Sequence, residues 1–110
     1  MTSGDQPTFD LAVRDNAEAT RYEVTANGEL AGFLTYRLHE NRVVFLHAEV
    51  DEKFEGHGVG SRLAREALDD VIRQGKQITP LCPFVNEYIH RHLQYVEHVD
   101  AVHRPEFATT

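Results

Sequence analysis

The sequence predicts an α+β domain built on a mixed sheet, and three observations support this fold class. Short segments with the composition of strands alternate with turn residues over the first half of the chain. An amphipathic helical pattern follows a glycine-rich turn and precedes a further strand-like segment. Since a strand–helix–strand crossover places its two strands in parallel, an antiparallel meander joined to such a unit gives a mixed sheet.

The length of 110 residues fits one domain with one hydrophobic core. We expect residues 1–8, which are rich in Ser, Gly, Asp and Pro, to form a flexible leader. A single domain is expected over residues 9–98, and residues 99–110 are expected to form a C-terminal tail with little to bury. No apolar segment approaches the ~20 residues that span a bilayer, and the acidic N-terminus is unlike a signal peptide.

The charge balance restricts the classes of partner. A formal net charge of −7 argues against nucleic acid or an anionic membrane bound through bulk electrostatics. Cys82 is the only cysteine, so no intramolecular disulfide forms, and a reducing, cytoplasmic location is the default expectation. The exposed edges of a small sheet are compatible with a monomer or a weak homodimer.

The first half of the chain is expected to form an antiparallel meander. Its strands are predicted over residues 9–14, 21–26, 30–38 and 43–50, with turns at 15–19 and 40–41. Asn27-Gly28 is typical of a type I′ hairpin, because both positions of that turn need a positive φ.

The 43–50 strand divides into two faces, because alternate residues of a strand point to opposite sides. One face is wholly apolar and is expected to contact the core; it consists of Val44, Leu46, Ala48 and Val50. The other face consists of Val43, Phe45, His47 and Glu49. The two ionisable groups therefore point the same way, roughly 7 Å apart.

The second half is expected to form the crossover and a closing helix. A helix is predicted from Ser61 to Gln74, because apolar residues recur there at helical spacing, and Gly75 suits its C-terminal end. Residues 77–81 are expected to form a short strand parallel to the 43–50 strand. A second helix is expected from Pro83, a residue tolerated in the first helical turn, to about His92.

Three alternating glycines lie between the 43–50 strand and the first helix; they are Gly56, Gly58 and Gly60. A turn into a helix aims backbone N–H groups and the positive end of the helix dipole at one point, which suits an anion such as a pyrophosphate. Glycines let the anion approach the backbone, because no side chain intervenes. Lys53, Arg62 and Arg65 surround this turn, where a phosphate would attract them. A purely structural turn is the alternative.

The glycine segment from Glu55 to Gly60 resembles the acetyl-coenzyme A pyrophosphate loop of GNAT-type N-acetyltransferases, written Gln/Arg-x-x-Gly-x-Gly/Ala. Glu55 stands where the family has Gln or Arg. With His47-Ala48-Glu49-Val50 and the segment from Pro80 to Val85, the loop is similar to a narrower branch of very small, single-domain members that carry a Cys-Pro-Phe segment. The resemblance covers residues 20–98. The sequence shows no counterpart of the N-terminal helices that usually cover the acceptor site in this family, and none of the usual C-terminal strand pair.

The resemblance implies that the chain binds acetyl-coenzyme A or coenzyme A. The residues expected to bind it are Val50, Asp51, Glu55, Gly56, His57, Gly58, Val59, Gly60, Ser61, Arg62, Asn86 and Arg91. Backbone groups of Val50 and Asp51 would pair with the pantetheine arm. One free amide there would stabilise negative charge on the thioester carbonyl oxygen. A frayed strand end is the alternative at these two residues.

The candidate catalytic residues are Glu49, His47 and Cys82. Direct acetyl transfer needs a neutral amine, so a carboxylate such as Glu49 near the cofactor would serve as the general base. His47 shares its face and titrates nearer neutrality. A thiolate at Cys82 would accept the acyl group, or its thiol would protonate the departing coenzyme A. The alternatives are a solvated carboxylate, a half-buried structural histidine and a small buried cysteine.

Two further groups of side chains suggest other roles. Tyr88 and Tyr95 compete for the leaving-group acid role that many members of the family give to a tyrosine, whereas the usual position holds Leu93. The histidines at 90, 92, 98 and 103 invite a metal site, but positions 90 and 92 point to different faces of a helix. No Cys or carboxylate pattern completes a tetrahedral set, so no metal is expected.

The predicted function is acyl-coenzyme A-dependent N-acyltransfer, with acetyl transfer to a small or side-chain amine as the reaction. The acidic net charge favours a cationic acceptor, such as a polyamine or a lysine side chain. The alternative is a coenzyme A binding or sensing module with little transferase activity, which the missing roof and the missing tyrosine favour. A third hypothesis is a structural partner protein with no cofactor affinity.

Overall fold

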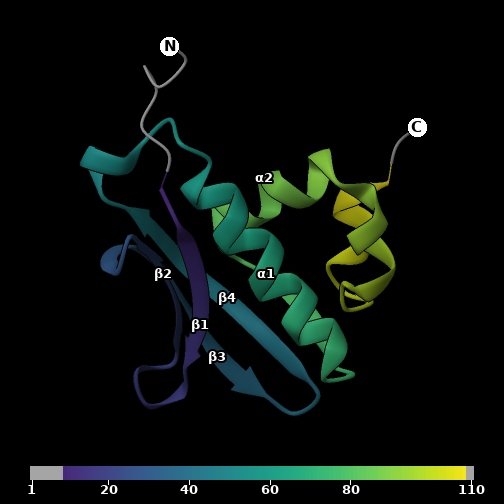
Figure 1. The fold of residues 1–110 in the computed structure, drawn as a ribbon. Helices are drawn as coiled ribbons and strands as arrows, with labels where there is room; N and C mark the ends of the chain where they lie inside the picture. The colour runs from purple at the N-terminus through teal and green to yellow at the C-terminus, as the bar shows by residue number, and fades with distance from the viewer. Residues whose placement is uncertain (1–8, 109–110) are drawn as a thin grey trace.

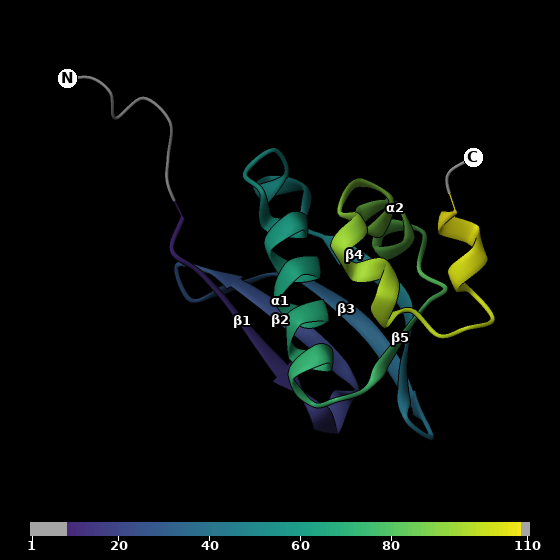
Figure 2. The ribbon, with the colours of Figure 1, turned by 90° about the vertical axis from the view of Figure 1, so that its right-hand side faces the viewer.

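The computed structural model describes residues 9–108, in which a five-stranded sheet carries two α-helices on one face (Figures 1 and 2). The strands lie in chain order across the sheet: β1 (Leu11–Asn16), β2 (Arg21–Ala26), β3 (Glu29–His39), β4 (Arg42–Val50) and β5 (Gln77–Pro80). The first four pair antiparallel, and β5 pairs with β4 in parallel. The predicted α+β fold with a mixed sheet is therefore confirmed. The expected leader over residues 1–8 lies outside the described residues.

The helices are α1 (Val59–Arg73) and α2 (Pro83–Arg91), close to their expected bounds. α1 ends as predicted at Gly75, whose φ is +74° and whose amide donates to the Ile72 carbonyl at 2.9 Å. The hairpin at Asn27-Gly28 is also confirmed, with φ values of +52° and +86°.

β1 begins two residues later than expected. Phe9, predicted as its first residue, packs its ring edge-on against Phe54 and His57, with centroid distances of 5.1 and 4.8 Å. β1 pairs only as far as the end of β2 at Ala26, because the chain reverses there at Asn27-Gly28. The Phe9 ring therefore packs against the segment that precedes α1.

The expected division of β4 into two faces is wrong for its first half. Tyr36 of β3 lies opposite Phe45, and Thr35 lies opposite His47, so Leu46 is an extra residue in a β-bulge. The bulge shifts the alternation by one residue. The face that packs on the helices therefore carries Val43 and Phe45 before the bulge and Ala48 and Val50 after it, and neither Val44 nor Leu46 belongs to this core cluster.

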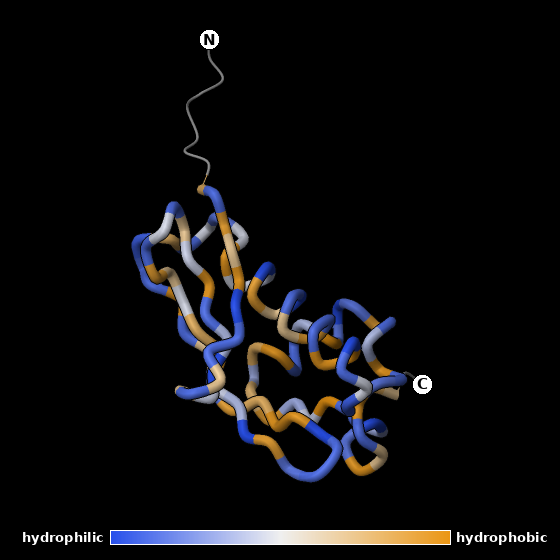
Figure 3. The backbone as a smooth tube through the Cα atoms, turned by 60° about the horizontal axis from the view of Figure 1, so that its bottom comes forward, coloured by the Kyte–Doolittle hydropathy of each residue, from blue (hydrophilic) through white to orange (hydrophobic). Residues whose placement is uncertain are grey.

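The core lies between the sheet and the helices. Leu63, Ala67 and Leu68 of α1 are at most 1% exposed and meet Leu34 and Phe45 from the sheet. Hydrophobic residues recur along the strands and helices in Figure 3, whereas the turns between strands are largely hydrophilic. No helix within residues 9–108 is long and apolar enough to cross a membrane.

The expectation of little burial after residue 98 is wrong for residues 99–108. Val99 forms a parallel bridge to Ile78 and is fully buried, and Phe107 is 4% exposed. Asp100 is 4% exposed and accepts hydrogen bonds from the Thr79 hydroxyl at 2.6 Å and from His103 Nδ1 at 2.8 Å. The contacts with Ile78 and Thr79 span 21 positions of sequence, so local sequence did not indicate them.

We expect Asp100→Asn to lower the free energy of unfolding by about 1–3 kcal/mol, because an amide cannot accept all the hydrogen bonds of the carboxylate. Burial raises the pKa of Asp100, but hydrogen bonds from Thr79 and His103 hold it below its ordinary value of 3.8. A lowered folded-state pKa stabilises the protein above pH 3.8, and this contribution is lost as the pH falls through the folded-state pKa. Urea unfolding at several pH values measures the difference in free energy of unfolding between the variant and wild type. Glu97→Gln, at an exposed carboxylate, is the control. Equal stability of Asp100→Asn and wild type would contradict the expectation.

Candidate functional site

β4 has an open edge beyond its bulge. Its pairing with β5 ends at Phe45 and Pro80, and the last link between them is the Cys82 amide, which donates to the Phe45 carbonyl at 2.8 Å. Residues 46–50 therefore have no partner strand on this side within the described part of the chain. The bulge and the short length of β5 together create this gap in the sheet.

The backbone groups at this edge have a defined direction. The Asp51 amide donates to the Ala31 carbonyl, and the His47 carbonyl accepts from the Thr35 hydroxyl, so the odd-numbered residues turn toward β3. By alternation, the backbone groups of Ala48 and Val50 face the open edge. The free amide expected at residue 50 or 51 thus belongs to Val50, because the amide of Asp51 already has a partner.

The chain joins β4 to α1 through a short, anchored turn. A 3₁₀ segment over Glu52–Phe54 is capped by Asp51, whose carboxylate accepts the Lys53 amide at 3.0 Å, and the buried Phe54 ring holds it on the core. Gly56 and Gly58 follow with φ values of +84° and +75°, which L side chains rarely adopt. These conformations let the backbone reverse with no side chain above it.

The N-terminus of α1 is free to bind an anion. α1 has no side-chain cap, and its first bond runs from the Arg62 amide to the Gly58 carbonyl at 3.0 Å. The N–H groups of the three preceding residues therefore have no acceptor within the helix. Gly60 is needed for a different reason, since a Cβ there would lie 2.8 Å from the Phe84 ring, where α2 approaches α1.

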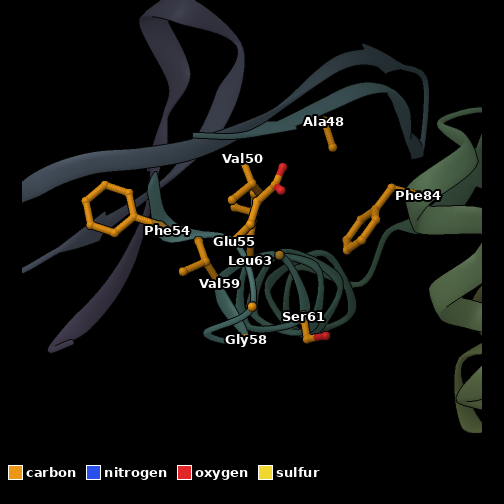
Figure 4. A pocket seen from close by; sticks show the side chains of 11 residues that line it. Ala48, Val50, Phe54, Glu55, Gly58, Val59, Ser61, Leu63 and Phe84 are labelled. Carbon is orange, nitrogen blue, oxygen red and sulfur yellow. The ribbon is translucent and has the colours of Figure 1, made fainter. Parts of the chain in front are cut away.

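A cavity of about 370 Å³ lies between the open edge of β4, the glycine loop and the start of α2 (Figure 4). Val50 and Phe84 lie on opposite sides of it in Figure 4, and Gly58 lies at the end where α1 begins. It is lined by Ala48, Val50, Phe54, Glu55, Gly56, Gly58, Val59, Gly60, Ser61, Leu63 and Phe84. Largely apolar walls with free amides at one end suit a ligand that has a long arm and an anionic group.

His47 and Glu49 lie on the sheet face that carries no helix. His47 Nε2 is 2.8 Å from a Glu49 carboxylate oxygen, so their predicted common face is confirmed. Their side chains are 58% and 61% exposed, and the Phe33 ring lies beside His47. A smaller cavity of about 150 Å³ adjoins them, lined by Leu30, Ala31, Gly32, Phe33, Glu49, Val50 and Asp51. Val50 borders both cavities.

Cys82 lies at the N-cap of α2 and is 1% exposed within the core cluster. Neither cavity described above includes it among its lining residues. Its backbone has a clear structural role, since its amide binds Phe45 and its carbonyl accepts the Asn86 amide at 2.9 Å. The geometry favours the alternative of a small buried side chain over an acyl-accepting thiolate.

Five of the expected cofactor ligands do not line the cavity: Asp51, His57, Arg62, Asn86 and Arg91. The side-chain amide of Asn86 donates to Glu106 at 3.1 Å and to the Pro80 carbonyl at 3.4 Å, which ties α2 to the C-terminal segment. Arg91 is near the C-terminus of α2, 72% exposed, and pairs with Glu87 one turn earlier.

The charged residues around the loop also have protein partners. The Lys53 ammonium donates to Glu29 at 2.7 Å, and this contact raises the pKa of Lys53. Arg62 pairs with Glu66 on α1. His57 packs on Phe9 as described above, and Glu55 brings a carboxylate to the cavity in place of the Gln or Arg of the loop pattern. Among the residues predicted from the loop pattern, the backbone groups are thus the ones best placed to bind an anion.

The two candidate tyrosines lie away from the larger cavity between β4 and α2. The Tyr95 hydroxyl donates to Asp69 at 2.8 Å, and burial with this bond raises the pKa of Tyr95 well above its ordinary value. Tyr88 packs in parallel on the His92 ring, at 4.0 Å between centroids. Within residues 9–108, no three His, Cys, Asp or Glu side chains converge as a metal site.

Sequence reasoning missed several walls of the cavity. Phe84 and Phe54 contribute rings from segments 30 positions apart, and Leu63 and Ala48 were assigned only to the core. The signal for Phe84 was present in the unusual Pro80–Val85 segment, but its contact with Gly60 depends on how α2 packs against α1. Phe54 carried no such signal.

Comparisons with known proteins found one family model and related sequences. A family model described as GCN5-related N-acetyl-transferase matches residues 21–99. The chain is 28% identical over 93 residues to Protein NATD1 of Gallus gallus, and the matched region covers 81% of this chain and 84% of that protein. It is 25% identical over 85 residues to Protein NATD1 of Xenopus tropicalis, covering 76% of this chain and 78% of that protein.

Proposed function

Because this chain belongs to the GCN5-related N-acetyltransferase family, we propose that it transfers an acetyl group from acetyl-coenzyme A to a primary amine. The observation that carries the proposal is the open edge of β4 beside the uncapped N-terminus of α1. An extended arm needs unpaired strand groups, and a diphosphate needs unpaired amides. One cavity of about 370 Å³ offers both.

Each part of the proposed cofactor has residues that would bind it. Gly56, Gly58 and Gly60, with the first amides of α1, would hold the diphosphate, and the outward backbone groups of Ala48 and Val50 would pair with the pantetheine arm. Acetyl-coenzyme A supplies a thioester carbonyl as the acyl donor. The Val50 amide would donate to the carbonyl oxygen as it gains negative charge.

The proposed transfer is direct. The amine nitrogen attacks the thioester carbonyl carbon, a C–N bond forms, and the C–S bond breaks to release the coenzyme A thiolate. The proton lost by the amine passes to Glu49, and His47 donates a hydrogen bond to that carboxylate through Nε2. Solvent protonates the thiolate in this scheme, because neither Tyr88 nor Tyr95 lines the larger cavity.

The acceptor is proposed to be a cationic amine that approaches from the face without helices. The residues that line the smaller cavity of about 150 Å³ include Glu49, Asp51 and Phe33. Carboxylates attract an ammonium group, and an aromatic face adds a cation–π contact. The net charge of −7 acts in the same direction.

Direct transfer predicts that Cys82 is dispensable for chemistry. We expect Cys82→Ser to keep its turnover per folded molecule and its coenzyme A affinity. The free energy of unfolding should fall by about 1–3 kcal/mol, since a hydroxyl replaces a buried thiol in an apolar setting. Steady-state rates and urea unfolding measure the two effects. Lost turnover with fold and affinity intact, in both Cys82→Ser and Cys82→Ala, would show that the thiol takes part in the reaction.

A turnover assay against a panel of amines separates the transferase from a coenzyme A binding module. The panel should include a polyamine, a lysine peptide and a neutral aromatic amine, with calorimetric titration of coenzyme A in parallel. Turnover with the cationic amines supports the proposal. Binding without turnover would favour the binding or sensing module, whose supporting observation is the absence of a covering element over Glu49 within residues 9–108. No binding would contradict both functions.

A further inference from the structure

A third cavity, of about 370 Å³, lies along α1 on its side toward α2 and β1. It shares Gly58 and Ser61 with the proposed cofactor cavity, so the two adjoin at the start of α1. Its lining is more polar, and consists of Leu11, Gly58, Ser61, Arg62, Arg65, Tyr88 and His92. The proposed acetyl transfer assigns no role to it.

Tyr88 is a buried tyrosine whose hydroxyl has no partner among residues 9–108. The residue is only 8% exposed, yet its hydroxyl makes no hydrogen bond with any described residue. The other tyrosine hydroxyls each donate to a carboxylate, those of Tyr22, Tyr36 and Tyr95 to Asp70, Asp15 and Asp69. A buried donor left unpaired is costly, so an orphaned hydroxyl at a cavity wall indicates an acceptor brought by a ligand.

The Tyr88 ring is held in place by its neighbours. It stacks on the His92 ring with an interplanar angle of 15°, and His92 Nδ1 donates to the Tyr88 carbonyl at 2.8 Å. A fixed ring gives its hydroxyl a fixed position, which favours binding because little side-chain freedom is lost.

Arg65 supplies the charge of this cavity. Its side chain makes no ion pair or hydrogen bond within residues 9–108, whereas Arg62 is paired with Glu66. Arg65 and Tyr88 line the same cavity. Burial raises the pKa of Tyr88, and the positive charge of Arg65 opposes that rise. Ser61 lies one turn, ~5.4 Å, before Arg65 on the same helix face. A free cation, a free hydroxyl and a buried orphan donor together suit a phosphate group.

We propose that this cavity binds the 3′-phosphate on the ribose of coenzyme A, through Arg65, Tyr88 and Ser61. The inference rests on the proposed function, which places the diphosphate at the adjoining glycine loop. Coenzyme A carries this third phosphate group beyond the diphosphate, at the end of the molecule away from the thiol. The cavity continues from the loop in the direction of Arg65, away from the open edge of β4.

The test is a calorimetric comparison of coenzyme A with dephospho-coenzyme A, which differs only in lacking the 3′-phosphate. We expect wild type to bind coenzyme A about 10- to 100-fold more tightly, the effect of charge-assisted hydrogen bonds. Arg65→Ala and Tyr88→Phe should each reduce this preference and leave the affinity for dephospho-coenzyme A unchanged. Tyr88→Phe keeps the ring and removes a hydroxyl that bonds no described residue, so it should fold as wild type.

Arg73→Ala is the matched control, since it removes the same charge from the other end of α1. It should keep the preference of wild type. Equal affinity of wild type for the two ligands would overturn the inference and leave the proposed function standing. A preference that survives both Arg65→Ala and Tyr88→Phe would overturn it as well. If wild type bound neither ligand, the proposed function itself would fail, and the inference with it.

Discussion

Gly58→Glu is expected to weaken coenzyme A binding by about 100-fold or more, because like charges brought together at a binding site cost several kcal/mol. The substitution would add a carboxylate where the free amides of α1 are proposed to hold the diphosphate. The added side chain would also have to adopt a φ of +75°. Calorimetric titration of coenzyme A into the folded variant measures the loss of affinity.

Gly28→Glu provides a matched control for this variant. Gly28 has a φ of +86°, and a Cβ there, as at Gly58, would meet no atom within 4 Å. The two variants therefore share backbone strain and charge change, but Gly28 lies in the hairpin between β2 and β3. Both should lose similar stability, and only Gly58→Glu should lose affinity. Full affinity in Gly58→Glu would show that the glycines are only a turn.

Glu49→Gln is expected to reduce turnover by about 10²- to 10⁴-fold, the usual contribution of a general base. Coenzyme A affinity should remain that of wild type, because the Glu49 side chain is 61% exposed on the face opposite the proposed cofactor cavity. Steady-state kinetics with the best amine of the panel, together with calorimetry, separate the two quantities. The variant keeps the size of the side chain and can still accept a hydrogen bond from His47.

Two further variants sharpen this experiment. Glu52→Gln changes the charge by the same amount at an exposed site three residues away, and it should keep full turnover. His47→Gln removes the Nε2 partner of Glu49 and should cause a smaller loss than Glu49→Gln, if the histidine only orients the carboxylate. Unchanged turnover in Glu49→Gln would exclude this residue as the base and leave His47 as the candidate base.

Local patterns predicted most elements of this fold because the physics that forms them is local. The Asn27-Gly28 hairpin needed positive φ at both positions, and the end of α1 needed a left-handed residue at Gly75. α1 itself followed from apolar spacing. In contrast, local patterns did not predict that Phe9 packs on Phe54 and His57, contacts that span more than 40 positions of sequence.

The β-bulge explains why the candidate site was only partly predicted. Strict alternation placed Leu46 in the core, whereas the bulge at this residue reversed the faces of the first half of β4. The His47–Glu49 pair survived the error because both residues follow the bulge. Asn86 and Arg91 were assigned by resemblance of position, and the structure gives them partners on α2 and in the C-terminal segment instead.

The sequence by itself determined the fold class, the order of the elements and the glycine loop, since backbone conformation and periodic burial are encoded in nearby residues. Only the tertiary structure decided where β4 parts from β5, which backbone groups face the gap, and that Phe84 closes the cavity against Gly60. It also decided that Cys82 is buried and that the Tyr88 hydroxyl lacks a partner among residues 9–108. These properties depend on which distant residues pack together, because burial and pairing are set by the neighbours that the folded chain supplies.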